Sequence, residues 1–129
     1  MRLYRPYGPG QLNRLIPKLA DRICQGQTIQ LSKEDRPFQT PIFVEDVVTA
    51  FERSLEATFA GPVTIAGDRV ISMRELAEAI GRILGLKPVF EQTRSETGDM
   101  IGDNTCMKKV LGSWPLVDLA EGLARTLKN

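Results

Sequence analysis

Two adjacent acids, Glu45 and Asp46, are the first side chains in this sequence that suggest a chemical role, because paired carboxylates can serve as general acid and base. They follow the apolar run 41–44 and precede Val47 and Val48. The same placement puts negative charge at the positive end of a helix that begins there. We favour this helix start over acid-base catalysis, and no catalytic residue is predicted.

Histidine is absent from the sequence, which excludes Ser-His-Asp and Cys-His nucleophile arrangements. Cys24 and Cys106 lie far apart in the sequence and have no histidine with which to share a metal, so no metal site is predicted. Because no signal peptide or long apolar run is evident, we expect a cytoplasmic protein with two buried thiols, and no membrane partner.

The composition is that of a globular protein. The chain has 129 residues, of which 42% are hydrophobic and 26% are charged, so we expect a single domain over residues 1–129. Seventeen Lys and Arg against sixteen Asp and Glu give a net charge of +1, and the basic residues are scattered. Nucleic acid is therefore not expected as a partner.

The elements of the first half follow from turn residues and helical spacing. A short strand around residues 3–6 ends at the Gly-Pro-Gly turn of residues 8–10, and a helix should begin near residue 13 or 14 and end at Gly26, with Pro17 in its first turn. Residues 28–31 suit a strand, and residues 32–40 an exposed polar loop. Val47, Val48, Phe51 and Leu55 mark a second amphipathic helix.

In the second half the clearest element is a helix that opens with a capping box of Ser72 and Glu75 and ends at Gly85. Strands are expected at residues 63–65, 70–71 and 88–90, a polar loop at 92–102, and two more helices at 104–111 and from about residue 119. Trp114 is interpreted as a packing anchor rather than a stacking platform for a ligand.

Strands that alternate with helices indicate an α/β or α+β-like arrangement, but the strands are few and short. They cannot make a full doubly wound sheet by themselves. We infer that these elements once packed against something else.

Four stretches, in order, resemble the extended branch of the short-chain dehydrogenase/reductase family, which contains nucleotide-sugar epimerases, dehydratases and reductases. The stretches are residues 2–11 (RLYRPYGPGQ), 41–48 (PIFVEDVV), 63–67 with 72–77 (VTIAG and SMRELA), and 98–99 with 111–115 and 119–123 (GD, LGSWP and LAEGL). The resemblance implies the C-terminal substrate domain of a Rossmann-type epimerase or dehydratase, without the dinucleotide-binding half.

The resemblance also implies a function for the chain: the substrate-binding portion of an NAD(P)-dependent enzyme, with a nucleotide sugar as ligand and a dinucleotide-binding partner chain. NAD or NADP is implied for a complete family member, and no cofactor for this chain alone. The family's catalytic Tyr-x-x-x-Lys is missing, because Gly8 and Gln11 stand four positions after the two tyrosines, Tyr4 and Tyr7. No glycine trio has the spacing of a phosphate-binding loop, so we expect no catalysis by the chain alone.

Some substrate-binding residues carry over from the resemblance. Asn13, Leu15 and Pro17 match the segment that approaches the nucleotide base in the family. Arg5 stands where the family commonly has an asparagine near the sugar, so this sequence departs from the pattern at that point.

Two further arginines are candidates for the diphosphate. Arg94 precedes Gly98 and Asp99 as the family's diphosphate-binding arginine often does, and a guanidinium suits phosphate oxygens; a solvated loop charge is an equal alternative. For Arg36, before residues 39–41, the solvated loop is favoured.

Two alternatives remain: a non-catalytic module that binds nucleotide diphosphates, and an oligomeric interaction module. The strand within residues 2–7 would leave an unpaired edge, which favours self-association. We therefore expect a homo-oligomer built across that edge.

Overall fold

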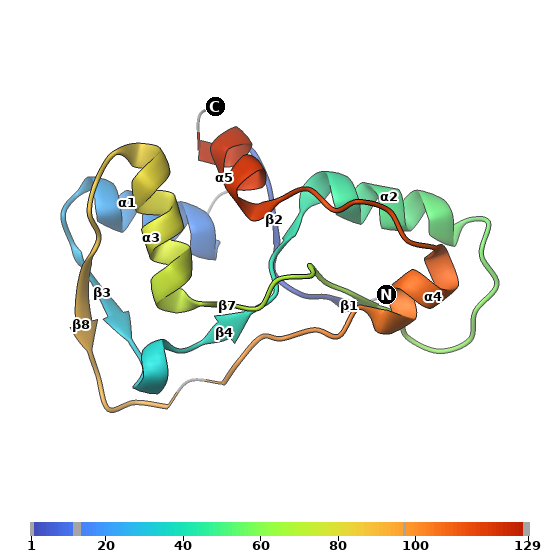
Figure 1. The fold of residues 1–129 in the computed structure, drawn as a ribbon, viewed down its shortest axis with the longest axis horizontal. Coiled ribbons are helices and arrows are strands. Elements are labelled where there is room, and N and C mark those ends of the chain that lie inside the picture. The colour runs from blue at the N-terminus through green and yellow to red at the C-terminus, as the bar shows by residue number, and fades with distance from the viewer. Residues whose placement is uncertain (1, 12–13, 97, 128–129) are drawn as a thin grey trace.

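Two hydrophobic clusters, placed side by side along an elongated molecule, organise the chain (Figure 1). The computed structural model describes residues 2–11, 14–96 and 98–127. The larger cluster joins three helices, α1 (Leu15–Cys24), α3 (Met73–Leu84) and α5 (Leu119–Leu127). The smaller cluster joins α2 (Val44–Ser54) and α4 (Thr105–Leu111).

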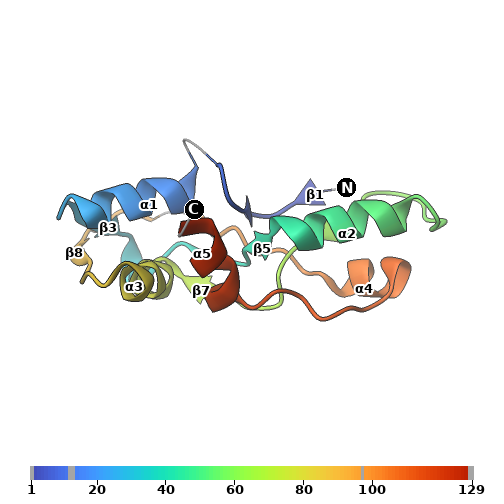
Figure 2. The same cartoon turned by 90° about the horizontal axis from the view of Figure 1, so that it is seen from above.

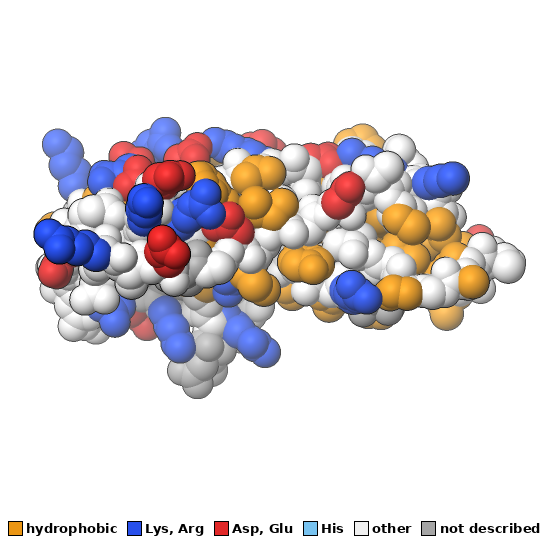
Figure 3. Space-filling model, turned by 90° about the horizontal axis from the view of Figure 1, so that it is seen from below, with side chains coloured by type: hydrophobic (Ala, Val, Ile, Leu, Met, Phe, Trp, Pro, Cys, Tyr) orange, Lys and Arg blue, Asp and Glu red, His pale blue; other side chains and the backbone are white. Residues whose placement is uncertain are grey.

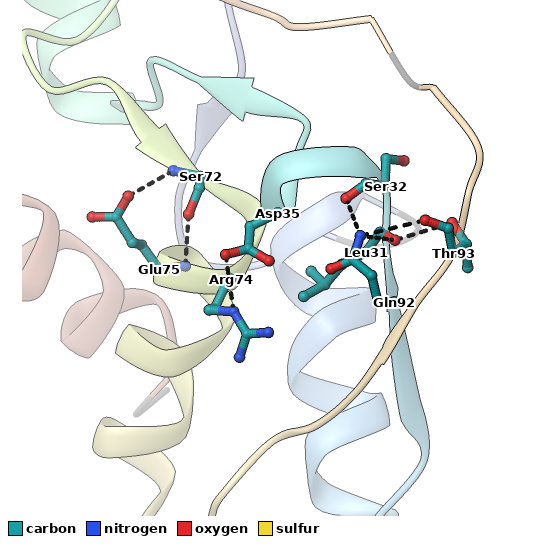
Figure 4. A network of polar contacts seen from close by, with 8 residues as sticks. All are labelled: Leu31, Ser32, Asp35, Ser72, Arg74, Glu75, Gln92 and Thr93. Carbon is teal, nitrogen blue, oxygen red and sulfur yellow. Dashed lines mark hydrogen bonds and ion pairs between the residues drawn. The ribbon is translucent and has the colours of Figure 1, made fainter.

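Helix α3 shows how the sequence specifies local structure. Ser72 Oγ accepts the backbone N–H of Glu75 at 3.1 Å, and the Ser72 N–H donates to Glu75 Oε1 at 3.2 Å, which confirms the capping box (Figure 4). Leu76 and Ile80 are fully buried on one face. Gly85 ends the helix in the left-handed region, with φ of 72°, a conformation that glycine adopts without a steric cost.

The strands are short, and within the described residues they pair only two by two. Three pairs are parallel and one is antiparallel. The parallel pairs are β1 (Arg2–Leu3) with β6 (Thr64–Ile65), β2 (Pro6–Tyr7) with β5 (Ile42–Phe43), and β3 (Thr28–Leu31) with β8 (Val89–Gln92); the antiparallel pair is β4 (Phe38–Gln39) with β7 (Ile71–Ser72). This mixed α/β arrangement confirms the α/β or α+β-like class expected from the sequence.

The loop at residues 32–40 is more ordered than predicted. It contains a 3₁₀ turn, η1 (Lys33–Asp35), and strand β4, and the side chain of Gln39 is 0% exposed. The expectation of an exposed loop is wrong here because β4 pairs with β7 on one side and with Met100 on the other. Gln92 Nε2 also donates to the Ser32 carbonyl at 2.7 Å, which ties β8 to the loop (Figure 4).

Two expectations about burial are also wrong. Cys24, the last residue of α1, and Cys106, in α4, are both exposed, because each lies off the face that its helix buries. On α2 the buried side chains are Asp46, Val47 and Ala50, whereas Leu55, just after the helix, is 86% exposed. In the described part of the chain, no helix has the length and apolar character needed to cross a bilayer.

Candidate functional site

A cavity of about 290 Å³ lies between β2 and the start of α1; we call it the β2–α1 cavity. It gathers side chains from β1, β2, the turn that follows, the first turn of α1, and one distant position. These are Leu3, Arg5, Pro6, Tyr7, Gln11, Arg14, Leu15, Ile16 and Met100. Two of the predicted site residues, Arg5 and Leu15, are therefore brought together.

Arg5 occupies an unusual position in this cavity. Its backbone lies in the left-handed region with φ of 52°, and its carbonyl accepts the N–H of Ile42 at 3.2 Å. The Nε atom is buried and has no hydrogen-bond partner in the described part of the chain. Burial lowers the pKa of the Arg5 guanidinium from its ordinary value, because the cationic form loses hydration.

Tyr7 forms the inner wall of the cavity. It is 2% exposed, and its ring meets that of Phe43 edge-on, with 5.4 Å between centroids. Burial raises the pKa of the Tyr7 hydroxyl well above its ordinary range, and the negative charges of Asp46 and Asp118 raise it further. This environment disfavours the deprotonated form of Tyr7, which is the form that a general base requires.

Helix α1 points its N-terminus toward the same cavity. Arg14, the residue before the helix, makes no side-chain capping bond, and Leu15 and Ile16 line the cavity. Their backbone N–H groups belong to the first turn, where α-helical donors have no partner within the helix. Gln11 Nε2 donates to the Pro6 carbonyl at 3.0 Å, which closes the turn between β2 and the helix.

Pro17, another predicted residue of this segment, does not join Arg5 and Leu15. Pro17 is half-buried in the first turn of α1, as predicted, but it does not line the cavity. Asn13 lies outside the described residues.

Arg36 belongs to a different place. A second cavity, of about 510 Å³, is lined by Lys33, Glu34, Arg36, Glu96 and Gly98. Arg36 Nη1 donates to Asp99 Oδ2 at 3.0 Å, while the other oxygen of Asp99 accepts the Phe38 N–H at 2.9 Å. The Arg36 charge is thus already neutralised by a neighbouring carboxylate.

Arg94 lies in the loop beside η1, where the Ser95 carbonyl accepts the Lys33 N–H at 3.2 Å. It is exposed, makes no ion pair or hydrogen bond with any described residue, and lines neither cavity. The three predicted arginines therefore occupy three separate environments.

Met100 and Arg14 are among the lining residues that the sequence did not predict. Arg14 is adjacent to Leu15, so the predicted start of the helix could have revealed it. Met100 reaches the cavity only because its N–H donates to the Phe38 carbonyl at 2.8 Å and its carbonyl accepts the Thr40 N–H at 3.3 Å. No local pattern signals such a long-range backbone pairing.

The turn at residues 8–10 differs from a phosphate-binding loop at Gly8. The glycines of the turn at residues 8–10 are the nearest equivalent of a phosphate-binding loop, but the Cα of Gly8 packs directly on Val44, so that a Cβ there would lie 2.5 Å from Val44 Cγ1. The space beside this glycine is filled by a side chain rather than open to a pyrophosphate. Among the described residues, no cluster of three or more Asp, Glu or Cys could hold a metal ion.

Comparison with known proteins places these features in a wider context. No family model matches the chain. It is 33% identical, over 132 aligned residues, to a UDP-glucose 4-epimerase of Mycolicibacterium smegmatis, and 31% identical over 127 residues to a dTDP-glucose 4,6-dehydratase of Streptomyces griseus. These alignments cover 95% and 94% of the chain, but only 42% and 39% of the relatives.

Solved structures show the same fold. A UDP-glucose 4-epimerase from Thermotoga maritima, determined with UDP-glucose, matches with a TM-score of 0.79 and 24% identity over 98% of the chain and 43% of its own. The enzyme WbmH of Bordetella bronchiseptica, determined with NAD⁺, matches with a TM-score of 0.79 and 18% identity over 99% of the chain and 43% of its own. The chain is therefore homologous to nucleotide-sugar epimerases and dehydratases over less than half of their length.

Proposed function

We propose that this chain is the substrate-binding portion of an NAD(P)-dependent nucleotide-sugar epimerase, dehydratase or reductase, corresponding to the C-terminal part of such an enzyme. The observation that carries the proposal is the β2–α1 cavity, where Arg5 and Leu15 meet in a chain that is homologous to enzymes of this kind. Leu15 and Ile16 offer an apolar wall to a base or sugar, and the N–H groups of the first turn, which have no partner within the helix, suit phosphate oxygens.

The chain alone lacks the groups for hydride transfer. Tyr7 has no lysine four positions later, and Gly8 in the turn at residues 8–10 is packed against Val44. The redox chemistry would come from a dinucleotide-binding half, which supplies NAD or NADP and the base. The role of this chain is then to hold the nucleotide sugar against that half.

A second candidate is a non-catalytic or oligomeric module derived from the same enzymes. It is favoured by the exposed apolar side chains of Leu3, in β1, and of Met100, which lines the same cavity as Leu3. Among the described strands β1 pairs only with β6, so its other edge is open to a second chain.

Nuclear magnetic resonance titration with UDP and dTDP tests the leading proposal. We expect saturable shifts at the backbone amides of Leu15 and Ile16, because these residues line the cavity. The amide of Arg82, in the last turn of α3, should not move, since it belongs to neither cavity. Absence of shifts up to millimolar nucleotide would contradict a substrate-binding role.

A further inference from the structure

Helix α2 carries more apolar surface than the described part of the chain covers. Val47 and Ala50 are buried in the smaller cluster, on the side of α2 that meets α4. A second row of apolar side chains on the same helix is exposed, and we call it the α2 stripe. It consists of Val44, Val48, Phe51 and Leu55, which are 40%, 50%, 47% and 86% exposed. Because residues three or four apart are neighbours on a helix surface, these side chains form one continuous row.

The α2 stripe lies next to the buried face of the helix. Val47 comes three residues after Val44 and four before Phe51, so the buried and exposed rows are adjacent. A surface helix normally turns one apolar face to its own core and presents polar residues elsewhere. An apolar face as wide as that of α2 is typical of a helix that packs against two bodies, of which the described residues supply one.

The first residue of the α2 stripe borders the candidate site. A Cβ at Gly8 would lie 2.5 Å from Val44 Cγ1, so the backbone of the turn after β2 packs directly on Val44. Gly8 follows Tyr7, which lines the β2–α1 cavity. A protein layer seated on the α2 stripe would therefore also border the turn that follows β2.

The charges beside the α2 stripe bear on the identity of that layer. Glu52 and Glu56 lie on the flank of the stripe away from Val47, are exposed, and form no ion pair with any described residue. A second copy that pairs antiparallel through the stripe would bring the two acidic flanks together, because a two-fold axis sets each patch against itself. Like charges disfavour such a pair, so the flank suits a different protein with basic side chains at the rim.

The size of the contact also favours a large partner. Each side of a stable interface contributes roughly 20–30 residues, so the α2 stripe is one part of a wider surface. The matched relatives contain protein that can form it, since the alignments cover only 42% and 39% of their length. In each relative the unmatched part and the matched part belong to one polypeptide, and the unmatched part is the larger.

We propose that the α2 stripe is the docking surface for the dinucleotide-binding half of the enzyme, with Val48 and Phe51 at the centre of the contact and Glu52 at its rim. The inference rests on the proposed function, because that function requires such a half. Removal of the apolar row from water drives the contact, and a Lys or Arg of the docked half meets Glu52. The proposal holds whether this half is supplied by the same polypeptide or by another.

A mixing experiment with the purified chain tests the proposal. The probe is the part of the Mycolicibacterium smegmatis UDP-glucose 4-epimerase that lies outside the match, purified as a separate polypeptide. The equivalent part of the Streptomyces griseus dTDP-glucose 4,6-dehydratase is a second probe, so that the result does not depend on the folding of one fragment. Analytical ultracentrifugation should show a 1:1 complex with at least one probe, and the chain alone should not associate through the α2 stripe.

Substitutions locate the contact on the chain. Phe51→Ser should weaken the complex at least about tenfold, as expected for an aromatic side chain at the centre of an interface. The control Leu86→Ser changes a side chain of similar exposure, 44%, just after α3 in the other half of the molecule, and should bind as wild type (Figure 1). Glu52→Lys should slow association several-fold, because rim charges act mainly on the association rate. Glu78→Lys, on the exposed side of α3, should not.

Thiol labelling gives a second readout that does not depend on affinity. The Val48→Cys thiol should react with a maleimide in the free chain and be protected in the complex. Cys24, exposed at the end of α1, should react equally in both states and serves as the internal control. Equal reaction of the Val48→Cys thiol in the free chain and in the complex would refute docking on the α2 stripe.

Other outcomes would also overturn the proposal. Absence of a complex with both probes would remove the docking surface, and a complex that Phe51→Ser leaves unchanged would place the contact elsewhere. Self-association of the chain that Phe51→Ser abolishes would show that a second copy covers the stripe. The UDP titration separates this inference from the proposed function: UDP binding without a complex refutes the docking surface alone, whereas a complex without UDP binding refutes substrate binding alone.

Discussion

Tyr7 shows how one residue links the candidate site to the core. Its ring packs on Phe43 and lines the β2–α1 cavity, while its hydroxyl reaches the backbone of Gly122 in α5. A Cβ at Gly122 would overlap the Tyr7 hydroxyl. The glycine is therefore required by close packing rather than by backbone conformation.

Replacing Gly122 with alanine should destabilise the chain. Overpacking against a buried ring costs about 1–3 kcal/mol, whereas alanine in a helix regains up to about 1 kcal/mol. We expect a net loss of about 1–2 kcal/mol in the free energy of unfolding, measured by urea denaturation. The control is Gly98→Ala, where a Cβ would meet nothing within 4 Å. An unchanged or raised stability of the Gly122 variant would show that α5 does not pack on Tyr7 in this way.

At the scale of elements, a buried carboxylate joins α2 to the segment that leads into α5. Asp46 is 4% exposed, accepts the Trp114 Nε1–H at 3.1 Å and accepts the Val117 N–H at 2.8 Å. The sequence predicted that Asp46 lies at a helix start, and it does lie in the first turn of α2. Its two tertiary hydrogen bonds were not predicted, because they connect residues far apart in the chain.

Asp46→Ala should loosen this connection. Removing the acceptor leaves the indole N–H and one backbone N–H unsatisfied, at a cost of about 2–4 kcal/mol. Since Trp114 is the single tryptophan, its fluorescence should shift toward that of a solvated indole before global unfolding in urea. Glu52→Ala, on the exposed face of α2, serves as the control and should unfold as wild type. A variant with unchanged fluorescence and midpoint would contradict the anchoring role.

How far the sequence predicts each element depends on whether its cause is local. The capping box of Ser72 and Glu75 and the helix end at Gly85 were predicted because the residues that form them are neighbours in sequence. The burial of Gln39 and the position of Met100 were not, because both depend on backbone pairing between distant segments. The same contrast between local and distant residues applies to the site. Arg5 and Leu15, which are near each other in sequence, share a cavity, whereas Arg94, which is far from both in sequence, lies elsewhere.

At the scale of the whole molecule, the short paired strands and the exposed apolar side chains indicate that some surfaces are not covered by other described parts of the chain. Among the described residues, strands pair only two by two, and the elements are spread along a long and shallow molecule (Figure 2). Val48 and Phe51 of α2 are exposed, and apolar side chains gather over the half of the molecule that carries α2 and α4 (Figure 3). Parallel strands are normally covered on both faces, so these surfaces suit a further protein layer. The homo-oligomer that the sequence predicts across β1 would provide such a layer, and it stays a prediction.

The most direct test of this account is a pair of calorimetric titrations of the purified chain, one with UDP-sugar and one with NAD⁺, followed by an assay for NADH formation when both are present. The account predicts saturable binding of the UDP-sugar, no heat from NAD⁺ and no NADH. Binding of NAD⁺ with oxidation of the sugar by this chain alone would contradict it.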